Sequence, residues 1–111
     1  MTHEQLLAML LEPHRSYNQH VARALGGDIS AAVYHQILLD HYDERRKGLQ
    51  PMPTADAIYT TTAMLPSEQS RCRQLLQALG IITIQPNLLG EQEIQLDFGP
   101  LVKLLDEESR P

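Results

Sequence analysis

The spacing of apolar residues predicts a series of helices followed by a two-stranded hairpin. Through most of residues 2–79 the apolar side chains recur every three or four positions, as they do on one face of a helix. This spacing predicts helices over residues 2–11, 16–25, 29–42, 55–65 and 68–79. Beyond residue 80 the period falls to two, the spacing of strands, over 82–85 and 94–98, with a turn between them. A last helix of one or two turns is expected over 100–105.

Small polar residues and glycines mark the expected ends of these helices. The side chain of a Ser, Thr or Asp can accept a hydrogen bond from the free N–H groups at a helix start. The predicted N-caps are Thr2, Asp28, Thr54 and Ser67. Glycine adopts the left-handed conformation that ends many helices more easily than other residues do. The predicted helix ends are Gly26-Gly27, Gly48 and Gly80.

Two of the helices carry apolar stripes that predict the core. The first stripe consists of Ile29, Val33, Ile37 and Leu38, widened by Ala32, Leu39 and Tyr42. The second consists of Cys72, Leu75, Leu76 and Leu79. A two-stranded hairpin is marginally stable alone, so we expect it to pack on the second stripe. The order of elements predicts a mainly α fold with a small β-hairpin, the winged helix-turn-helix. We expect one domain over 1–105, with an N-terminal helical extension, and a polar, disordered tail over 106–111.

Two stretches of the chain resemble a known group of winged-helix proteins. NQHVARALGGDISAAVYHQILLDHY (18–42) and LPSEQSRCRQLLQALGIITIQ (65–85) resemble parts of the N-terminal domain of phage and plasmid replication-initiation proteins related to the DnaD primosome protein. The resemblance covers residues 18–84 and implies DNA binding in replication initiation or its regulation, a homodimer, and replication proteins as partners. The helix followed by Leu-Gly-Ile-Ile is also shared with other winged-helix families, such as MarR-like regulators.

Composition places the chain among small globular proteins. Its 111 residues suffice for one domain, with a core built from aliphatic residues because there are only four Tyr, one Phe and no Trp. The single cysteine, Cys72, cannot form an internal disulfide, and we expect a buried thiol in a reducing compartment. Neither a signal peptide nor a membrane-spanning run is recognisable, so the predicted location is the cytoplasm, with no membrane partner.

The sequence predicts no catalytic, metal or cofactor site. It has no phosphate-binding loop of the G-x-x-x-x-G-K-S/T type and no G-x-G-x-x-G or G-x-S-x-G motif. His14 and His20 are six residues apart, as are His35 and His41, whereas a helical metal site pairs ligands four residues apart. We therefore expect the chain to act by binding and not as an enzyme.

One face of helix 68–79 has side chains suited to DNA recognition. Arg pairs with guanine and Gln with adenine in the major groove, and Ser near a helix start can contact phosphate. The residues predicted to contact DNA there are Ser67, Ser70, Arg71, Arg73, Gln74 and Gln77. A second basic cluster, Arg45, Arg46 and Lys47, is a further candidate for phosphate contact, although cations near a helix end are also favoured by the helix dipole alone.

The charge of the chain opposes DNA binding and supports a second hypothesis. The formal net charge is −5, whereas proteins that bind nucleic-acid phosphates are usually basic. The hairpin has no Lys or Arg between Thr83 and Leu96, and it carries Glu91 and Glu93. The alternative function is a winged helix that mediates protein interaction or oligomerisation.

The N-terminal segment is more apolar than a small core requires. Apolar helices outside a core often form dimer interfaces. The residues predicted to form a homodimer interface are Leu6, Leu7, Leu10 and Leu11. The other interpretation is that this segment folds back over its own core.

Overall fold

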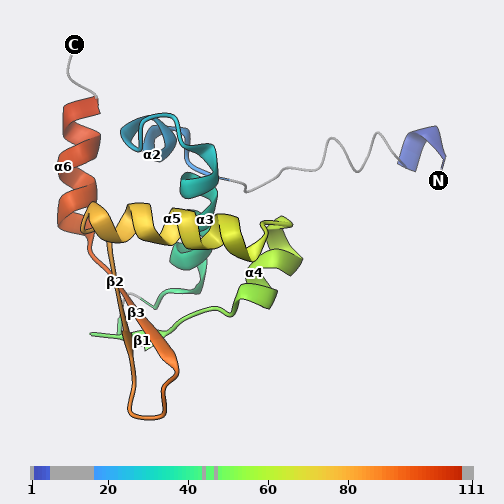
Figure 1. Ribbon diagram of the computed structural model, residues 1–111. Helices are drawn as coiled ribbons and strands as arrows, with labels where there is room; N and C mark the ends of the chain where they lie inside the picture. Colours follow the sequence, from blue (N-terminus) through green and yellow to red (C-terminus); the bar gives the residue numbers. More distant parts are fainter. Residues whose placement is uncertain (1, 6–16, 44, 47, 109–111) are drawn as a thin grey trace.

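The computed structural model describes residues 2–5, 17–43, 45–46 and 48–108, which form several helices and a small antiparallel sheet (Figure 1). The elements are α2 (Gln19–Ala24), α3 (Ile29–His41), β1 (Gln50–Pro51), α4 (Ala55–Thr62), α5 (Pro66–Ala78), β2 (Ile82–Pro86), β3 (Gln92–Leu96) and α6 (Phe98–Glu108). The strands lie in the order β1-β3-β2. The fold is therefore mainly helical, as predicted, but its sheet has one strand more than expected.

Three of the four predicted N-caps are confirmed. The side chains of Thr2, Asp28 and Thr54 each accept a hydrogen bond from the backbone N–H three residues later, at 3.0–3.1 Å. The prediction for Ser67 is wrong, because α5 begins at Pro66, two residues earlier than predicted, and its N-cap is Leu65, with no side-chain hydrogen bond. Pro66 explains this start, since proline in the first helical turn has a suitable φ and lacks the N–H that would need a cap.

Helix α3 is the centre of the core. It contacts α2 on one side and α5 on another. Six of its residues are buried: Ala31, Ala32, Tyr34, His35, Ile37 and Leu38. The predicted stripe, with Ala32, Leu39 and Tyr42 widening it, misses Ala31, Tyr34 and His35. Its first member, Ile29, is wrong because this residue is 54 % exposed at the helix start. The small side chains of Ala31 and Ala32 allow neighbouring helices to approach closely.

Helix α5 contributes the second layer of the core, largely as predicted. Cys72 and Leu76 are fully buried and Leu75 is half-buried, whereas Leu79 lies at the surface. Leu79 is the C-cap, so it lies past the last turn that packs on α3. Gly80 follows with a φ of +75°, the left-handed conformation predicted for it, and the chain enters β2 directly.

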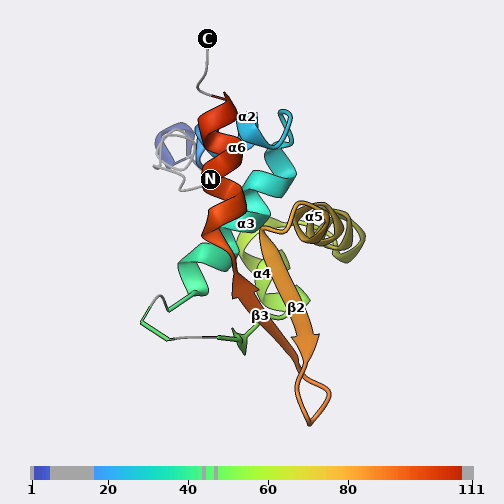
Figure 2. The same cartoon turned by 90° about the vertical axis from the view of Figure 1, so that its left-hand side faces the viewer.

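The β2–β3 hairpin projects from the helices at the end of α5 (Figure 2). Its register pairs Ile82 with Leu96 and Ile84 with Ile94, which places these apolar side chains on one face. Strand β1 pairs Gln50 with Ile94 and adds the third strand. The predicted second strand ends too late, because Phe98 begins α6 and is 40 % exposed.

Helix α6 extends the structure beyond the predicted short turn. It lies beside α2 and buries Leu101 (Figure 1). Residues 106–108 are helical, so the prediction of a disordered tail from residue 106 is wrong for these three residues. They are polar because they continue the exposed side of a helix that is already docked through its apolar face.

Candidate functional site

Six of the residues predicted to contact DNA lie on α5, but on different sides of it. Of the candidates on α5, four are exposed and two are half-buried. Ser67, Arg71, Gln74 and Gln77 are the exposed residues, and Ser70 and Arg73 are the half-buried ones. The two arginines have different surroundings, and these decide what each can do.

Arg71 is bound by two carboxylates within the fold. Its two terminal guanidinium nitrogens lie 2.7 and 3.0 Å from the two oxygens of Asp28, and it also lies 2.7 Å from Glu68 Oε1. Bidentate pairs of this kind are the strongest form of side-chain hydrogen bonding. The hydrogen bond from Arg71 lowers the pKa of Asp28, so this carboxyl group stays ionised. The positive charge of Arg71 is therefore offset, and the residue connects α5 to the start of α3.

Arg73 is the arginine whose charge is not paired. One of its terminal nitrogens donates to Ser70 Oγ at 3.0 Å, and within the described ranges no carboxylate forms an ion pair with it. The hydroxyl of the neighbouring Tyr34 is buried, and no described residue meets it in good hydrogen-bond geometry. Burial raises the pKa of Tyr34, and the charge and a weaker hydrogen-bonding contact of Arg73 partly offset this rise.

A groove of about 450 Å³ lies between α5, the start of α4 and the hairpin. We call it the α4–hairpin groove. Met52 and the buried Ile58 give it apolar walls. Arg73 lines it from α5, and Glu91 and Glu93 line it from the hairpin. A second hollow, of about 320 Å³, shares Met52 and Arg73 with this groove and reaches Gln77 and Ile84.

The tip of the hairpin presents two leucines to solvent. The relative exposure of Leu88 is 106 % and that of Leu89 is 83 %. The turn that carries them is held by Asn87, whose Oδ1 accepts from the backbone N–H groups of Leu89 and Glu91, both at 2.9 Å. Gly90 completes the turn with a φ of +80°. The leucines are thus held outward by local hydrogen bonds, and an adjacent Leu-Leu pair within a turn is the sequence signal for such a surface.

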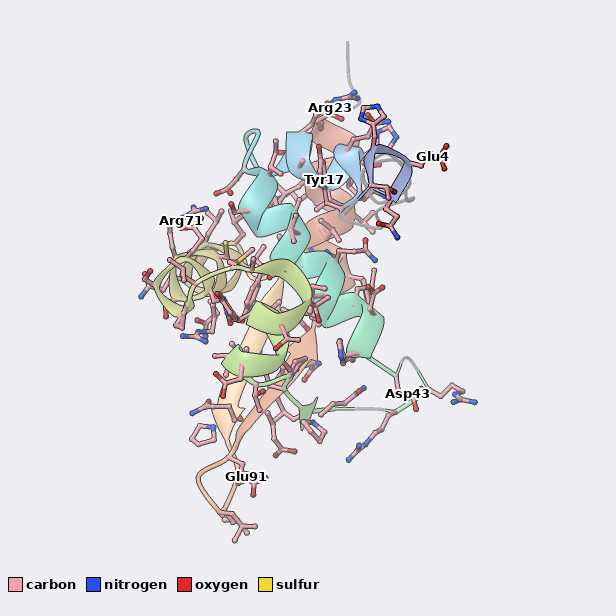
Figure 3. All side chains as sticks on the ribbon, turned by 90° about the vertical axis from the view of Figure 1, so that its right-hand side faces the viewer. Glu4, Tyr17, Arg23, Asp43, Arg71 and Glu91 are labelled. Atoms are coloured by element: carbon pink, nitrogen blue, oxygen red, sulfur yellow. The ribbon has the colours of Figure 1, made fainter. Side chains whose placement is uncertain are left out.

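The predicted basic cluster after α3 is separate from Arg71. Arg45 and Arg46 are exposed, and Arg45 forms a 3.2 Å ion pair with Asp43. Figure 3 shows Asp43 and Arg71 on opposite sides of the molecule. Lys47 lies outside the described residues. Among the residues that can be placed, the two groups of basic side chains do not form one continuous positive surface.

The dimer interface predicted from the sequence consists of four leucines. Leu6, Leu7, Leu10 and Leu11 all lie outside the described residues.

Within the described ranges, no three His, Cys, Asp or Glu side chains are grouped so that they could hold a metal ion. None of the helices in the part of the chain that the structure describes has the length and apolar composition that crossing a membrane requires.

Comparisons with known protein families, with curated proteins and with solved structures give no match.

Proposed function

We propose that this chain is a winged-helix module that binds another protein through its hairpin. In this interpretation α4 and α5 are the helix-turn-helix, α5 is the recognition helix, and β2–β3 is the wing. The short strand β1 joins the wing as the third strand of the sheet. A winged helix has two common uses for this surface, binding DNA or binding protein, and the charges of the side chains favour the second.

The surface formed by α4, α5 and the wing is acidic. Residues 49–98 contain only two basic residues, Arg71 and Arg73, against five carboxylates. One of these two arginines is already paired with Asp28 and Glu68. Each phosphate contact in DNA binding is normally made by a Lys, Arg or polar donor, and carboxylates on the wing repel the phosphates. A wing with Glu91 and Glu93 is therefore poorly suited to lie along a DNA backbone.

The observation that carries the proposal is the exposure of Leu88 and Leu89 at the tip of the wing. Burying a leucine side chain contributes about 1.5–3 kcal/mol. Because Asn87 already holds the backbone of the turn, a partner that covers these leucines has mainly their side-chain rotamers to order. Covering the two side chains removes apolar surface from water, which favours association.

DNA binding stays a second candidate because of one specific observation. Ser67, Gln74 and Gln77 are exposed on the outer side of α5, and their amide and hydroxyl groups can pair with base edges. The resemblance to replication-initiation proteins supports either candidate, since a protein-binding wing can act on a replication partner of phage or plasmid type.

A titration with DNA separates the two candidates. Labelled random-sequence duplex and single-stranded DNA are titrated with the protein at low and moderate salt. We expect no binding tighter than the range of about 10–100 µM that weak non-specific contacts give. Tighter binding that weakens with salt and with Arg73→Ala contradicts the proposal and favours the DNA-binding candidate.

Affinity capture from cells that produce the protein tests the wing itself. The wild type is compared with Leu88→Ser/Leu89→Ser, which removes the exposed apolar pair. The matched control is Ile29→Ser/Leu65→Ser, which removes two other apolar side chains that are 54 % and 60 % exposed. We expect a specific partner to be lost with the wing variant alone. A partner that is retained by the wing variant contradicts the proposal.

A further inference from the structure

We propose that the α4–hairpin groove binds an extended segment of the partner in which an aliphatic side chain lies close to a Lys or Arg. This inference rests on the proposed protein-binding function and specifies a second contact, behind the tip of the wing. The proposed occupant of the groove is a basic and apolar peptide segment of the partner. It is neither a DNA backbone nor a second copy of this acidic chain.

The size and the lining of the groove suit an aliphatic side chain. Its volume of about 450 Å³ lies within the range of about 300–1,000 Å³ that is usual for binding pockets. Met52, Ile58 and the prolines at 51 and 53 supply apolar surface, and Ala55 at the start of α4 lines the groove with only a methyl group. An aliphatic side chain that enters between them replaces water next to apolar atoms, which is the main source of affinity at such sites.

The charge on the wing side of the groove selects the residue next to that aliphatic side chain. Glu91 and Glu93 both line the groove, and neither forms an ion pair with any described residue. No Lys or Arg occurs in the sequence between Arg73 and Lys103, so the wing supplies no basic neighbour of its own. A Lys or Arg of the partner provides the missing positive charge.

Arg73 on the opposite wall fixes the direction of the segment. Arg73 lines the groove, and one of its terminal nitrogens donates to Ser70 Oγ. The remaining N–H groups can donate to a backbone carbonyl or a carboxylate of the partner. A basic side chain is repelled from this wall and attracted to the other, so the segment has one favoured orientation across the groove.

Two alanines of α4 offer a matched steric test. Ala55 and Ala57 are both exposed on the same helix, but only Ala55 lines the groove. Ala55→Phe therefore fills the groove, whereas Ala57→Phe adds the same side chain outside it. Melting curves of both variants establish that each is folded. For charge, Glu91→Gln/Glu93→Gln is compared with Glu4→Gln/Glu107→Gln, which removes two exposed carboxylates elsewhere.

The probe is a random-peptide library displayed on phage and selected on the wild-type protein, and enriched peptides are then synthesised and titrated. We expect them to combine an aliphatic residue with a nearby Lys or Arg. Ala55→Phe is expected to weaken binding about tenfold or more, the loss of a central contact, while Ala57→Phe has little effect. Glu91→Gln/Glu93→Gln is expected to weaken it about threefold to tenfold, and the control pair is expected to leave it unchanged.

The opposite results separate this inference from the proposed function. Enriched peptides that lack basic residues, or that bind Ala55→Phe as well as the wild type, overturn the groove assignment and leave a protein-binding wing intact. Failure to enrich any peptide, together with salt-sensitive DNA binding, overturns both. A change of oligomeric mass on Ala55→Phe, measured by sedimentation, shows that a second copy occupies the groove and also overturns the inference.

Discussion

Asp28 has two roles that substitutions can separate. Its Oδ1 accepts from the Ala31 N–H and caps α3, and the same carboxylate forms the bidentate pair with Arg71 of α5. Asn is as good an N-cap as Asp but carries no charge. Asp28→Asn therefore removes the ion pair and retains the cap, whereas Asp28→Ala removes both.

The expected losses follow from these two contacts. Loss of a cap lowers the free energy of unfolding by about 0.5–2 kcal/mol. The ion pair is partly exposed to solvent, with 47 % of the Arg71 side chain and 20 % of the Asp28 side chain accessible, so we assign it only about 0.2–1 kcal/mol. Urea unfolding should show a loss of about 0.2–1 kcal/mol for Asp28→Asn and about 0.7–3 kcal/mol for Asp28→Ala.

A double-mutant cycle and a pH series test this division of the Asp28 contribution into an N-cap and an ion pair. The losses of unfolding free energy caused by Asp28→Asn and Arg71→Ala should be less than additive, because each removes the same pair.

The pH series follows the charge of Asp28. Since the pKa of Asp28 is lowered in the folded state, its contribution to stability is fully present above the unfolded pKa of about 3.9 and disappears as the pH falls through the folded pKa. The difference in stability between the wild type and Arg71→Ala should therefore shrink below about pH 4. Burial also lowers the pKa of His35. The effect of His35 on stability is present in the wild type and in Arg71→Ala, so it cancels in the difference between their stabilities. An Asp28→Asn variant as unstable as Asp28→Ala, or fully additive losses, would refute the reasoning.

Two further predictions concern buried polar groups of α5. The Gln69 side chain is 2 % exposed and donates to the carbonyls of Ala55 and Met64. Gln69→Leu should lower the free energy of unfolding by about 1–3 kcal/mol, because it leaves these acceptors unpaired, while Gln74→Leu on the exposed side should change it by less than about 0.5 kcal/mol. Equal effects in urea unfolding would show that the two hydrogen bonds contribute nothing. Burial raises the pKa of the Cys72 thiol to about 11. A thiol reagent at pH 8 should therefore label it only after unfolding, and rapid labelling of the native protein would contradict its burial.

The helices were predictable because their signals are local. A cap, an apolar stripe and a terminal glycine all lie within one segment. Helix α3 carries the cap Asp28 and a stripe, α5 carries a stripe and Gly80, and α4 carries the cap Thr54. The errors arise where tertiary packing decides. A two-residue strand such as β1 contains no period to detect, and it forms because β3 presents a free edge to Gln50. The exposure of Ile29 likewise depends on which neighbouring helix reaches the first turn of α3.

The candidate site was predictable in its residue types but not in its electrostatics. The sequence identifies α5 as the helix with polar side chains outside, and the structure places Gln74 and Gln77 there. It gives no sign that Arg71 meets Asp28, because 43 residues separate the two and the contact depends on how α5 crosses α3. The α4–hairpin groove was missed for a similar reason, since its walls come from three separate segments.

The different surroundings of Arg71 and Arg73 explain why residue type alone is a poor guide to function in this fold. Two arginines two positions apart on a helix point to different sides of it. Here one side faces the carboxylate that caps α3, and the other faces a groove whose far wall is acidic. The first arginine stabilises the packing of two helices, and the second is left with hydrogen-bond donors for a partner. An electropositive surface for DNA would need both charges on the same face and a basic wing, and this chain has neither arrangement among the residues that the structure describes. Its acidic wing instead brings exposed leucines and unpaired carboxylates together, and that combination complements a basic, apolar protein surface.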